Sequence, residues 1–151
     1  MDRAEEIDAI AAALMDLMGF FNSPRQDDVL LKAAGVALPR ALFPLLVRIG
    51  ASGAIGVVLL AEQVGRDHST ISRQVAQLQK LGLVKRRANS SDNRVNEAAI
   101  TRKGEQAVAR IANARRRLLG ALLSQWSRKE CRDLAALNRR LADLIRKAQR
   151  G

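Results

Sequence analysis

The stretch that decides the fold is AEQVGRDHSTISRQVAQLQK, residues 61–80. It holds Ala61, then Gly65 four residues later and Ile71 ten residues later. Two helices that cross at a steep angle need a small residue where they touch, which is Ala61. The turn between them needs a residue that tolerates positive φ, which is Gly65. Asp67 is a natural N-cap for the second helix. The spacing therefore predicts a helix-turn-helix.

The second helix of this motif combines a buried stripe with a polar face. Ile71, Val75 and Leu78 recur at i, i+4 and i+7, which places them on one side of a helix. The opposite side carries hydroxyls, amides and two cations around the small Ala76, and it carries no acid. Such a face can enter a major groove and bond base edges and phosphates. An ordinary amphipathic surface helix would explain the stripe but not the acid-free face. The polar residues of this face and its flanks are Ser69, Thr70, Ser72, Arg73, Gln74, Gln77 and Lys80.

A basic hairpin is predicted directly after this helix. Residues 83–88 and 94–100 flank the polar turn Asn89-Ser-Ser-Asp-Asn93. The first strand carries Lys85, Arg86 and Arg87, and Arg94 opens the second. A two-stranded wing with cations at its tip can lay an Arg into the minor groove. The alternative is a solvated basic hairpin.

The distribution of charge agrees with an anionic partner for this half of the chain. The chain has 151 residues, 48% of them hydrophobic, and a formal net charge of +11. Residues 1–65 contain 5 basic and 8 acidic side chains, and residues 66–151 contain 21 basic and 7 acidic ones. An excess of this size favours binding to an anion. A single Cys and a single His exclude a disulfide framework and a His-clustered metal site within one chain.

Helices are predicted before this segment. The stretch Arg3–Phe21 carries an apolar stripe that needs another helix against it. A short helical turn is expected over residues 29–34 and a helix over residues 38–49, in which Pro44 implies a kink or a late start. Residues 50–56 contain three glycines but lack the ending of a phosphate loop, so we expect a flexible connection.

Two helices are predicted after the hairpin. Thr101 is a good N-cap for a helix that runs to about Leu123. The run Ser127-Arg-Lys-Glu130 is a capping box that opens the last helix. That helix has its apolar residues at spacings of 3 and 4, namely Leu134, Leu137, Leu141, Leu144 and Ala148.

The motifs from the second helix onward resemble the MarR family of bacterial transcription regulators. They are Ser69-Thr-Ile-Ser-Arg73, Gly82-Leu-Val-Lys-Arg86, Asp92-Asn-Arg94 and Ile100-Thr101-Arg-Lys-Gly104. The spacing from Asp-x-Arg to Ile-Thr-x-x-Gly is the most specific of them. The resemblance covers nearly the whole chain. It implies a mainly α fold with a small β-wing, a winged helix-turn-helix, and a homodimer made by the N- and C-terminal helices.

The resemblance also implies roles for single residues. Five would contact the major groove: Ser69, Thr70, Ser72, Arg73 and Gln77. The amide of Gln74 also suits base edges. Arg94 would reach the minor groove with Asp92 orienting it, and the phosphate contacts would be Lys80, Arg86 and Arg87. The second wing strand departs from the family, because residues 96–99 are Asn-Glu-Ala-Ala and have weak strand propensity. Glu97 would be repelled by phosphate unless it points away or pairs with Arg86.

A small, often aromatic, acid is the effector that the resemblance implies. The expected lining is Leu14, Met18, Phe21, Phe43 and Leu46, with Arg48 as the carboxylate partner, although a plain hydrophobic core would contain the same residues. His68 is expected to be a surface residue at a helix start, and Cys131 a packing residue rather than an oxidant sensor.

The sequence as a whole predicts three segments. Residues 1–37 form an N-terminal dimerisation helix and linker, residues 38–101 the DNA-binding domain, and residues 102–151 the C-terminal dimerisation helices. The predicted function is a sequence-specific DNA-binding transcription regulator, a homodimeric repressor on a pseudo-palindromic operator. The alternatives are a non-specific architectural DNA-binding protein and a helical module that binds another protein. No enzymatic activity, cofactor, metal or membrane partner is expected, and the acidic N-terminus is unlike a targeting peptide, so we expect a cytoplasmic protein.

Overall fold

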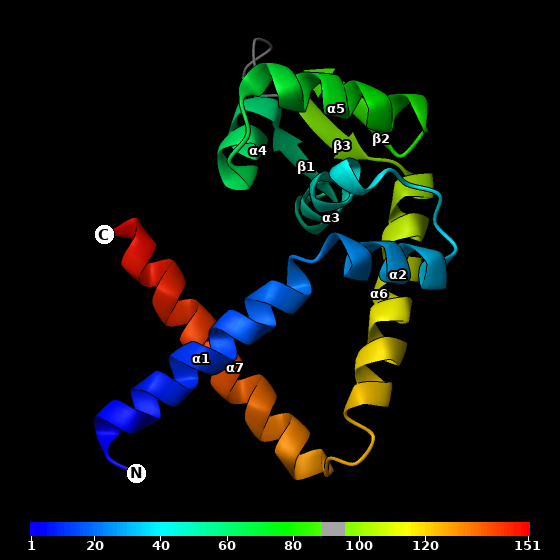
Figure 1. Ribbon diagram of the computed structural model, residues 1–151. Coiled ribbons are helices and arrows are strands. Elements are labelled where there is room, and N and C mark those ends of the chain that lie inside the picture. Colours follow the sequence, from blue (N-terminus) through cyan, green and yellow to red (C-terminus); the bar gives the residue numbers. More distant parts are fainter. Residues whose placement is uncertain (89–95) are drawn as a thin grey trace. The chain divides into compact units, whose positions relative to one another are not determined.

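The computed structural model describes residues 1–88 and 96–151 (Figure 1). The chain forms two compact units, residues 1–114 and residues 115–151. One long helix, α6 (Arg102–Leu122), contributes to both units. The first unit also contains helices α1 to α5 and a small antiparallel sheet. The predicted fold class, mainly α with a small β-wing, is confirmed.

The N-terminal region contains two helices. Helix α1 spans Arg3–Phe21, as predicted, and begins with a capping box between Asp2 and Glu5. Helix α2 spans Pro24–Ala34, so the short turn predicted over residues 29–34 was wrong in length. Pro24 stands in the first turn, where its missing N–H costs nothing, and Gly35 closes the helix with a φ of 67°.

The next helix begins later than its apolar pattern suggested. A 3-10 turn, η1 (Arg40–Leu42), precedes α3 (Phe43–Ser52). Of the two alternatives that Pro44 left open, the late start is therefore confirmed, because Pro44 lies in the first turn of α3. Leu45, Leu46 and Ile49 on this helix are fully buried.

The glycine-containing segment 50–56 is ordered structure, so the prediction of a flexible connection was wrong. Its first residues complete α3, Gly53 turns the chain with a φ of 75°, and β1 (Ala54–Gly56) follows. Strand β1 pairs with β3 (Asn96–Ile100), which also pairs with β2 (Val84–Ala88). All pairings are antiparallel and the strand order is β1-β3-β2. The small sheet therefore has one strand more than the predicted hairpin.

The core of the first unit lies where this sheet meets α3, α4 (Val57–Val64) and α5 (His68–Lys80). Ile49, Leu60, Ile71 and Leu78 have no exposed surface there. Complete burial of each such side chain contributes about 1.5–3 kcal/mol to folding. The apolar stripe predicted for the second helix of the motif, including Val75, is thus buried as expected.

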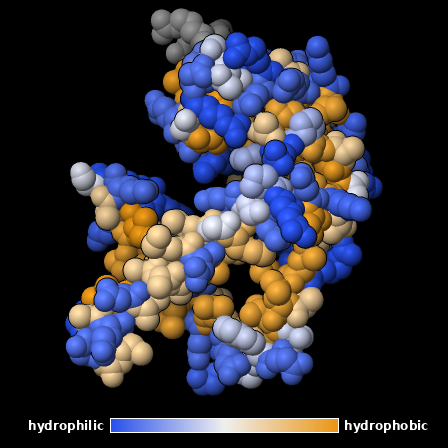
Figure 2. All heavy atoms as spheres, viewed as in Figure 1, coloured by the Kyte–Doolittle hydropathy of each residue, from blue (hydrophilic) through white to orange (hydrophobic). Residues whose placement is uncertain are grey.

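The terminal helices bury none of their own residues. Helix α7 (Arg128–Arg150) opens with the predicted capping box between Ser127 and Glu130. The apolar stripes of α1 and α7 remain open to solvent, as in Ile7 at 54% exposure and Leu144 at 65%. Figure 2 shows apolar atoms along the surface of α1. Across residues 1–88 and 96–151, no helix has both the length and the hydropathy needed to cross a membrane.

Candidate nucleic-acid interface

Helices α4 and α5 form the predicted helix-turn-helix. Ala61 is buried at their contact, and Gly65 has a φ of 68° in the left-handed region. The N–H of Gly65 donates to the carbonyl of Glu62 (3.3 Å), and the N–H of Arg66 donates to the carbonyl of Ala61 (3.1 Å). This pair of bonds closes α4 and satisfies carbonyls that a helix end leaves free. The small residue and the glycine therefore occupy the places that their spacing predicted.

Asp67 caps α5, as predicted, and its carboxylate also holds two hydroxyls of the first turn. It accepts the backbone N–H of Thr70 (3.1 Å) and the side-chain hydroxyls of Ser69 and Thr70, both at 2.5 Å. The hydroxyl of Ser69, followed by that of Thr70, holds the pKa of the Asp67 carboxyl well below its usual range. Ser69 and Thr70 were predicted to contact bases. In the free protein their protons are engaged, so their oxygens remain available only as acceptors.

The solvent-facing side of α5 is polar and cationic. Ser69, Arg73, Gln77 and Lys80 are exposed on it, and Ser72 is half-buried at its edge. The Nη2 of Arg73 lies 3.4 Å from the hydroxyl of Thr70, which is a weak contact that leaves the guanidinium free to move. The exposed face is therefore the one that sequence spacing predicted.

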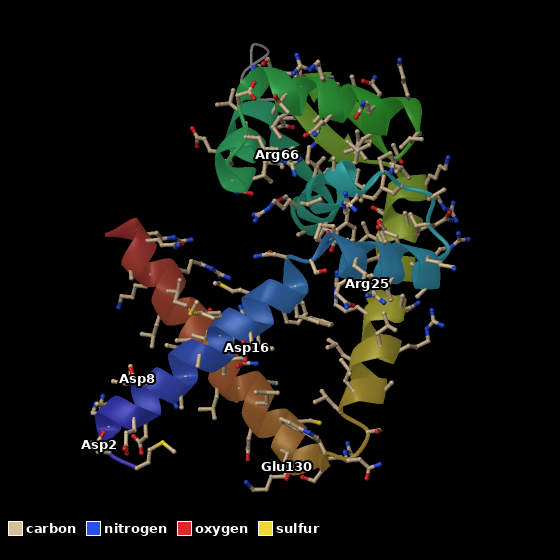
Figure 3. The ribbon with its side chains drawn as sticks, in the orientation of Figure 1. Asp2, Asp8, Asp16, Arg25, Arg66 and Glu130 are labelled. Atoms are coloured by element: carbon tan, nitrogen blue, oxygen red, sulfur yellow. The ribbon has the colours of Figure 1, made fainter. Side chains whose placement is uncertain are left out.

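Arg66 ties the turn of the motif to two other elements. Its Nη1 donates to the carbonyl of Ala41 (3.0 Å) in η1 and to Oε1 of Gln74 (2.9 Å) in α5. Figure 3 shows Arg66 within the first unit, beside the turn that joins α4 to α5. Gln74, a predicted base contact, therefore uses its acceptor inside the protein. The sequence carried no signal for this link, because Ala41 lies far from Arg66 along the chain.

The first wing strand is anchored to α5 by Arg86. Its Nη2 donates to the backbone carbonyl of Ser72 (2.5 Å) and lies 3.2 Å from the Ser72 hydroxyl. Within the described residues the buried Nε of Arg86 has no hydrogen-bond partner. A side chain predicted to hold phosphate thus connects the wing to the second helix of the motif in the free protein.

Glu97 pairs with Arg87, so Arg86 was the wrong partner in the sequence-based alternative. The register places Arg87 directly opposite Glu97, and the Nε of Arg87 lies 3.2 Å from a Glu97 carboxylate oxygen. Neighbouring residues on a strand point to opposite faces, which explains why Arg86 and Arg87 have different partners. Asp92 and Arg94, the predicted minor-groove pair, lie outside the described residues.

The Thr101–Gly104 motif fastens α6 to the turn between α5 and the wing. The N–H of Thr101 donates to the carbonyl of Leu83 (3.1 Å), and its hydroxyl donates to the carbonyl of Gly82 (2.6 Å). The same hydroxyl accepts the N–H of Gly104 (3.1 Å), as an N-cap does. A Cβ on Gly104 would lie 2.2 Å from the Leu83 carbonyl oxygen, so only glycine allows this close approach.

The six predicted effector-binding residues are spread over α1 and α3. Leu46 is fully buried in the core, Phe43 and Leu14 are half-buried, and Met18, Phe21 and Arg48 are exposed. Two pockets of about 840 and 300 Å³ lie elsewhere in the first unit, and none of the six lines either of them. Their predicted role therefore stays a prediction. In the part of the chain that the structure describes, no group of three His, Cys, Asp or Glu side chains could hold a metal.

The family and the fold are also supported by comparison with known proteins. The MarR family model matches residues 38–95. A curated relative, the uncharacterized HTH-type transcriptional regulator YxaD of Bacillus subtilis (strain 168), is 34% identical over 93 residues. That match covers 62% of this chain and 65% of the relative, so it spans slightly less than two thirds of that protein.

Two solved structures share this fold over most of their length. A MarR family protein from Bacillus stearothermophilus has a TM-score of 0.78 at 21% identity, covering 96% of this chain and 98% of that chain. A probable transcriptional regulator from Pseudomonas aeruginosa has a TM-score of 0.55 at 27% identity, and the match covers 78% of this chain and 89% of that chain. With the helix-turn-helix, the wing strands and the Thr101–Gly104 motif in place, the chain has the winged helix-turn-helix fold, and its residues 38–95 match the MarR family model.

Proposed function

We propose that this protein is a transcription regulator that binds specific sequences in double-stranded DNA through α5. The observation that carries the proposal is the exposed face of α5, which combines hydroxyls, an amide, Arg73 and Lys80 without an acid. The helix behind this face is held rigidly by its cap, by the α4 contact and by Arg86. A rigid helix with such side chains is better suited to hydrogen bonding with base edges in a major groove than to purely electrostatic binding of phosphates.

The roles of the other cations follow from their positions. Lys80 at the end of α5 and Arg87 on β2 are exposed and suited to phosphates. Arg86 is proposed to act on DNA mainly by holding the wing against α5, because its guanidinium already donates to Ser72. Arg94 in the minor groove, oriented by Asp92, is carried over from the family resemblance.

The proposed working form is a homodimer built from the terminal helices. Helices α1 and α7 leave their apolar stripes uncovered, which is unfavourable for a monomer in water. Helix α1 is rich in acids and α7 is rich in Arg and Lys, so contacts between copies can also be complementary in charge. A two-fold symmetric dimer would bind a pseudo-palindrome whose half-sites lie about 34 Å apart.

Repression and release by a small aromatic acid complete the proposal. Both rest on the family resemblance. Leu14, Met18, Phe21, Phe43, Leu46 and Arg48 remain the proposed contacts of that acid.

Selection from a pool of random duplexes tests the proposal. The full-length protein is incubated with the pool at two salt concentrations, and the bound duplexes are sequenced after several rounds. We expect one enriched pseudo-palindrome, with half-sites about one helical turn apart. Enrichment of no sequence, together with a steep loss of binding on addition of salt, would instead identify a non-specific architectural protein.

A further inference from the structure

A pocket in the first unit reaches α5 only at its first residue, His68. It has a volume of about 840 Å³ and is lined by β1, by the solvent-facing side of α4, and by the first residues of α5 and β3. Figure 1 shows α4 beside β1 in this unit. Val58 and Leu59 form part of its wall and are 61% and 49% exposed, respectively. Sites for small molecules commonly have this volume and such apolar walls.

The charge of this pocket is opposite to that of the protein. Glu62 and Glu97 line it, and none of its lining residues in the described parts of the chain is Lys or Arg, although the chain carries a net charge of +11. Glu97 is already engaged in an ion pair, because its carboxylate lies 3.2 Å from the Nε of Arg87, so the charge that the proposal uses is that of Glu62. Glu62 is exposed and forms no ion pair within residues 1–88 and 96–151. A cleft lined by one sign of charge concentrates the opposite ion.

We propose that this pocket binds a small organic cation with an apolar body, such as an aromatic amine or a quaternary ammonium ion. The carboxylate of Glu62 would meet the cationic group, and Val58 and Leu59 would cover the apolar body. Gln63, His68 and Asn96 offer further polar contacts at the wall. Phosphates of DNA would be repelled from the same place, so the pocket is separate from the proposed DNA contacts.

An occupant of this pocket would touch both DNA-contacting elements of the proposed function. His68 is the first residue of α5, and Glu97 holds Arg87 on the neighbouring wing strand. A cation beside Glu97 would compete with Arg87 for its carboxylate. This consequence for DNA binding rests on the proposed function, whereas binding of the cation itself does not.

The experiment measures binding without DNA. Benzyltrimethylammonium and benzoate, which share a ring but differ in charge, are titrated into the full-length protein, and backbone amide shifts are followed by NMR. We expect shifts that saturate at Val58, Leu59 and Gln63 with the cation, and much weaker binding of benzoate. The absence of such shifts, or equal binding of both probes, would overturn the proposal.

Matched variants test whether Glu62 supplies the negative charge that binds the cation. Glu62→Gln should weaken binding of the cation about threefold or more. The substitution removes the ion pair between Glu62 and the cation, and the expected loss is that of a solvent-exposed ion pair. Val58→Lys should abolish binding by placing an ammonium in the pocket. Glu105→Gln, in the first turn of α6 and outside the pocket, is the control and should leave the affinity unchanged. Equal affinities for Glu62→Gln and wild type would contradict the assignment.

Discussion

Replacing Gly104 by Ala tests whether α6 is fastened to the turn before the wing by close backbone contact. The added methyl carbon would lie 2.2 Å from the Leu83 carbonyl oxygen and 2.8 Å from Cγ1 of Ile100. Because non-bonded contacts between a methyl carbon and a carbonyl oxygen are about 1 Å longer than this, α6 and the turn that contains Leu83 have to move apart. The same Leu83 carbonyl accepts the N–H of Thr101 at 3.1 Å, so the separation also strains this hydrogen bond.

The expected net effect is a loss of about 1–3 kcal/mol in the free energy of unfolding. Forcing an extra methyl into a packed site costs about 1–3 kcal/mol. A weakened hydrogen bond adds about 1 kcal/mol, and the better helix propensity of Ala returns about 1 kcal/mol. For a chain of 151 residues this corresponds to a decrease in Tm of roughly 2–12 °C.

The assay is thermal unfolding followed by circular dichroism at one fixed protein concentration. Gly120→Ala is the matched control, because Gly120 lies in the same helix and a Cβ there meets nothing within 4 Å. The control should raise the Tm slightly, since only the helix propensity changes. If Gly104→Ala raises the Tm as much as Gly120→Ala does, the close contact with Leu83 does not exist and the reasoning is refuted.

Three further predictions concern other parts of the chain. Asp67→Asn should destabilise the protein above the ordinary carboxyl pKa of 3.8, and the difference from wild type should shrink as the pH falls below it. Urea unfolding across this range checks the prediction, and a pH-independent difference would contradict it. Arg86→Lys should cost about 1 kcal/mol and speed amide exchange in β2, since the link to Ser72 is lost. An unchanged exchange rate would mean that the link contributes nothing. Leu144→Asp should give a monomer in sedimentation velocity, whereas an intact dimer would exclude this face of α7 from the interface.

Local signals predicted most of the helices. The bounds of α1 agree with the expected range, and the capping box at Ser127 opens α7 as its residues indicated. Such features depend on neighbours within one or two turns of the chain, which a sequence displays directly. Helix α2 was also signalled, by Pro24 at its start and Gly35 at its end, but its weak apolar pattern concealed its length.

The sequence predictions that were wrong concern features that depend on contacts between residues distant in the chain. Strand β1 has only three residues, and its pairing with β3 places Ile55 opposite Ala98. Nothing local in residues 50–56 indicates a strand, because the partner supplies the order. The pairing of Glu97 with Arg87 likewise depends on strand register, which no spacing between the two residues encodes.

The exposed face of α5 was predictable, but the bonds within it were not. Helical spacing alone separates the buried stripe from the polar side. The engagement of Gln74 by Arg66 depends on η1, which comes much earlier in the chain. The residues predicted to contact bases therefore differ in how strongly they are hydrogen-bonded within the protein. Among them, Arg73 combines exposure and positive charge with only a weak internal contact.

The central claim, that α5 binds a specific DNA sequence, is tested most directly at Arg73. Affinities of wild type and Arg73→Ala are measured for the selected duplex and for a scrambled duplex at one salt concentration. Arg139→Ala on α7 serves as a control for loss of one positive charge. We predict that Arg73→Ala loses about 1–3 kcal/mol on the selected duplex and much less on the scrambled one. An equal loss on both duplexes, like that of Arg139→Ala, would show that Arg73 contributes only charge and would contradict the account.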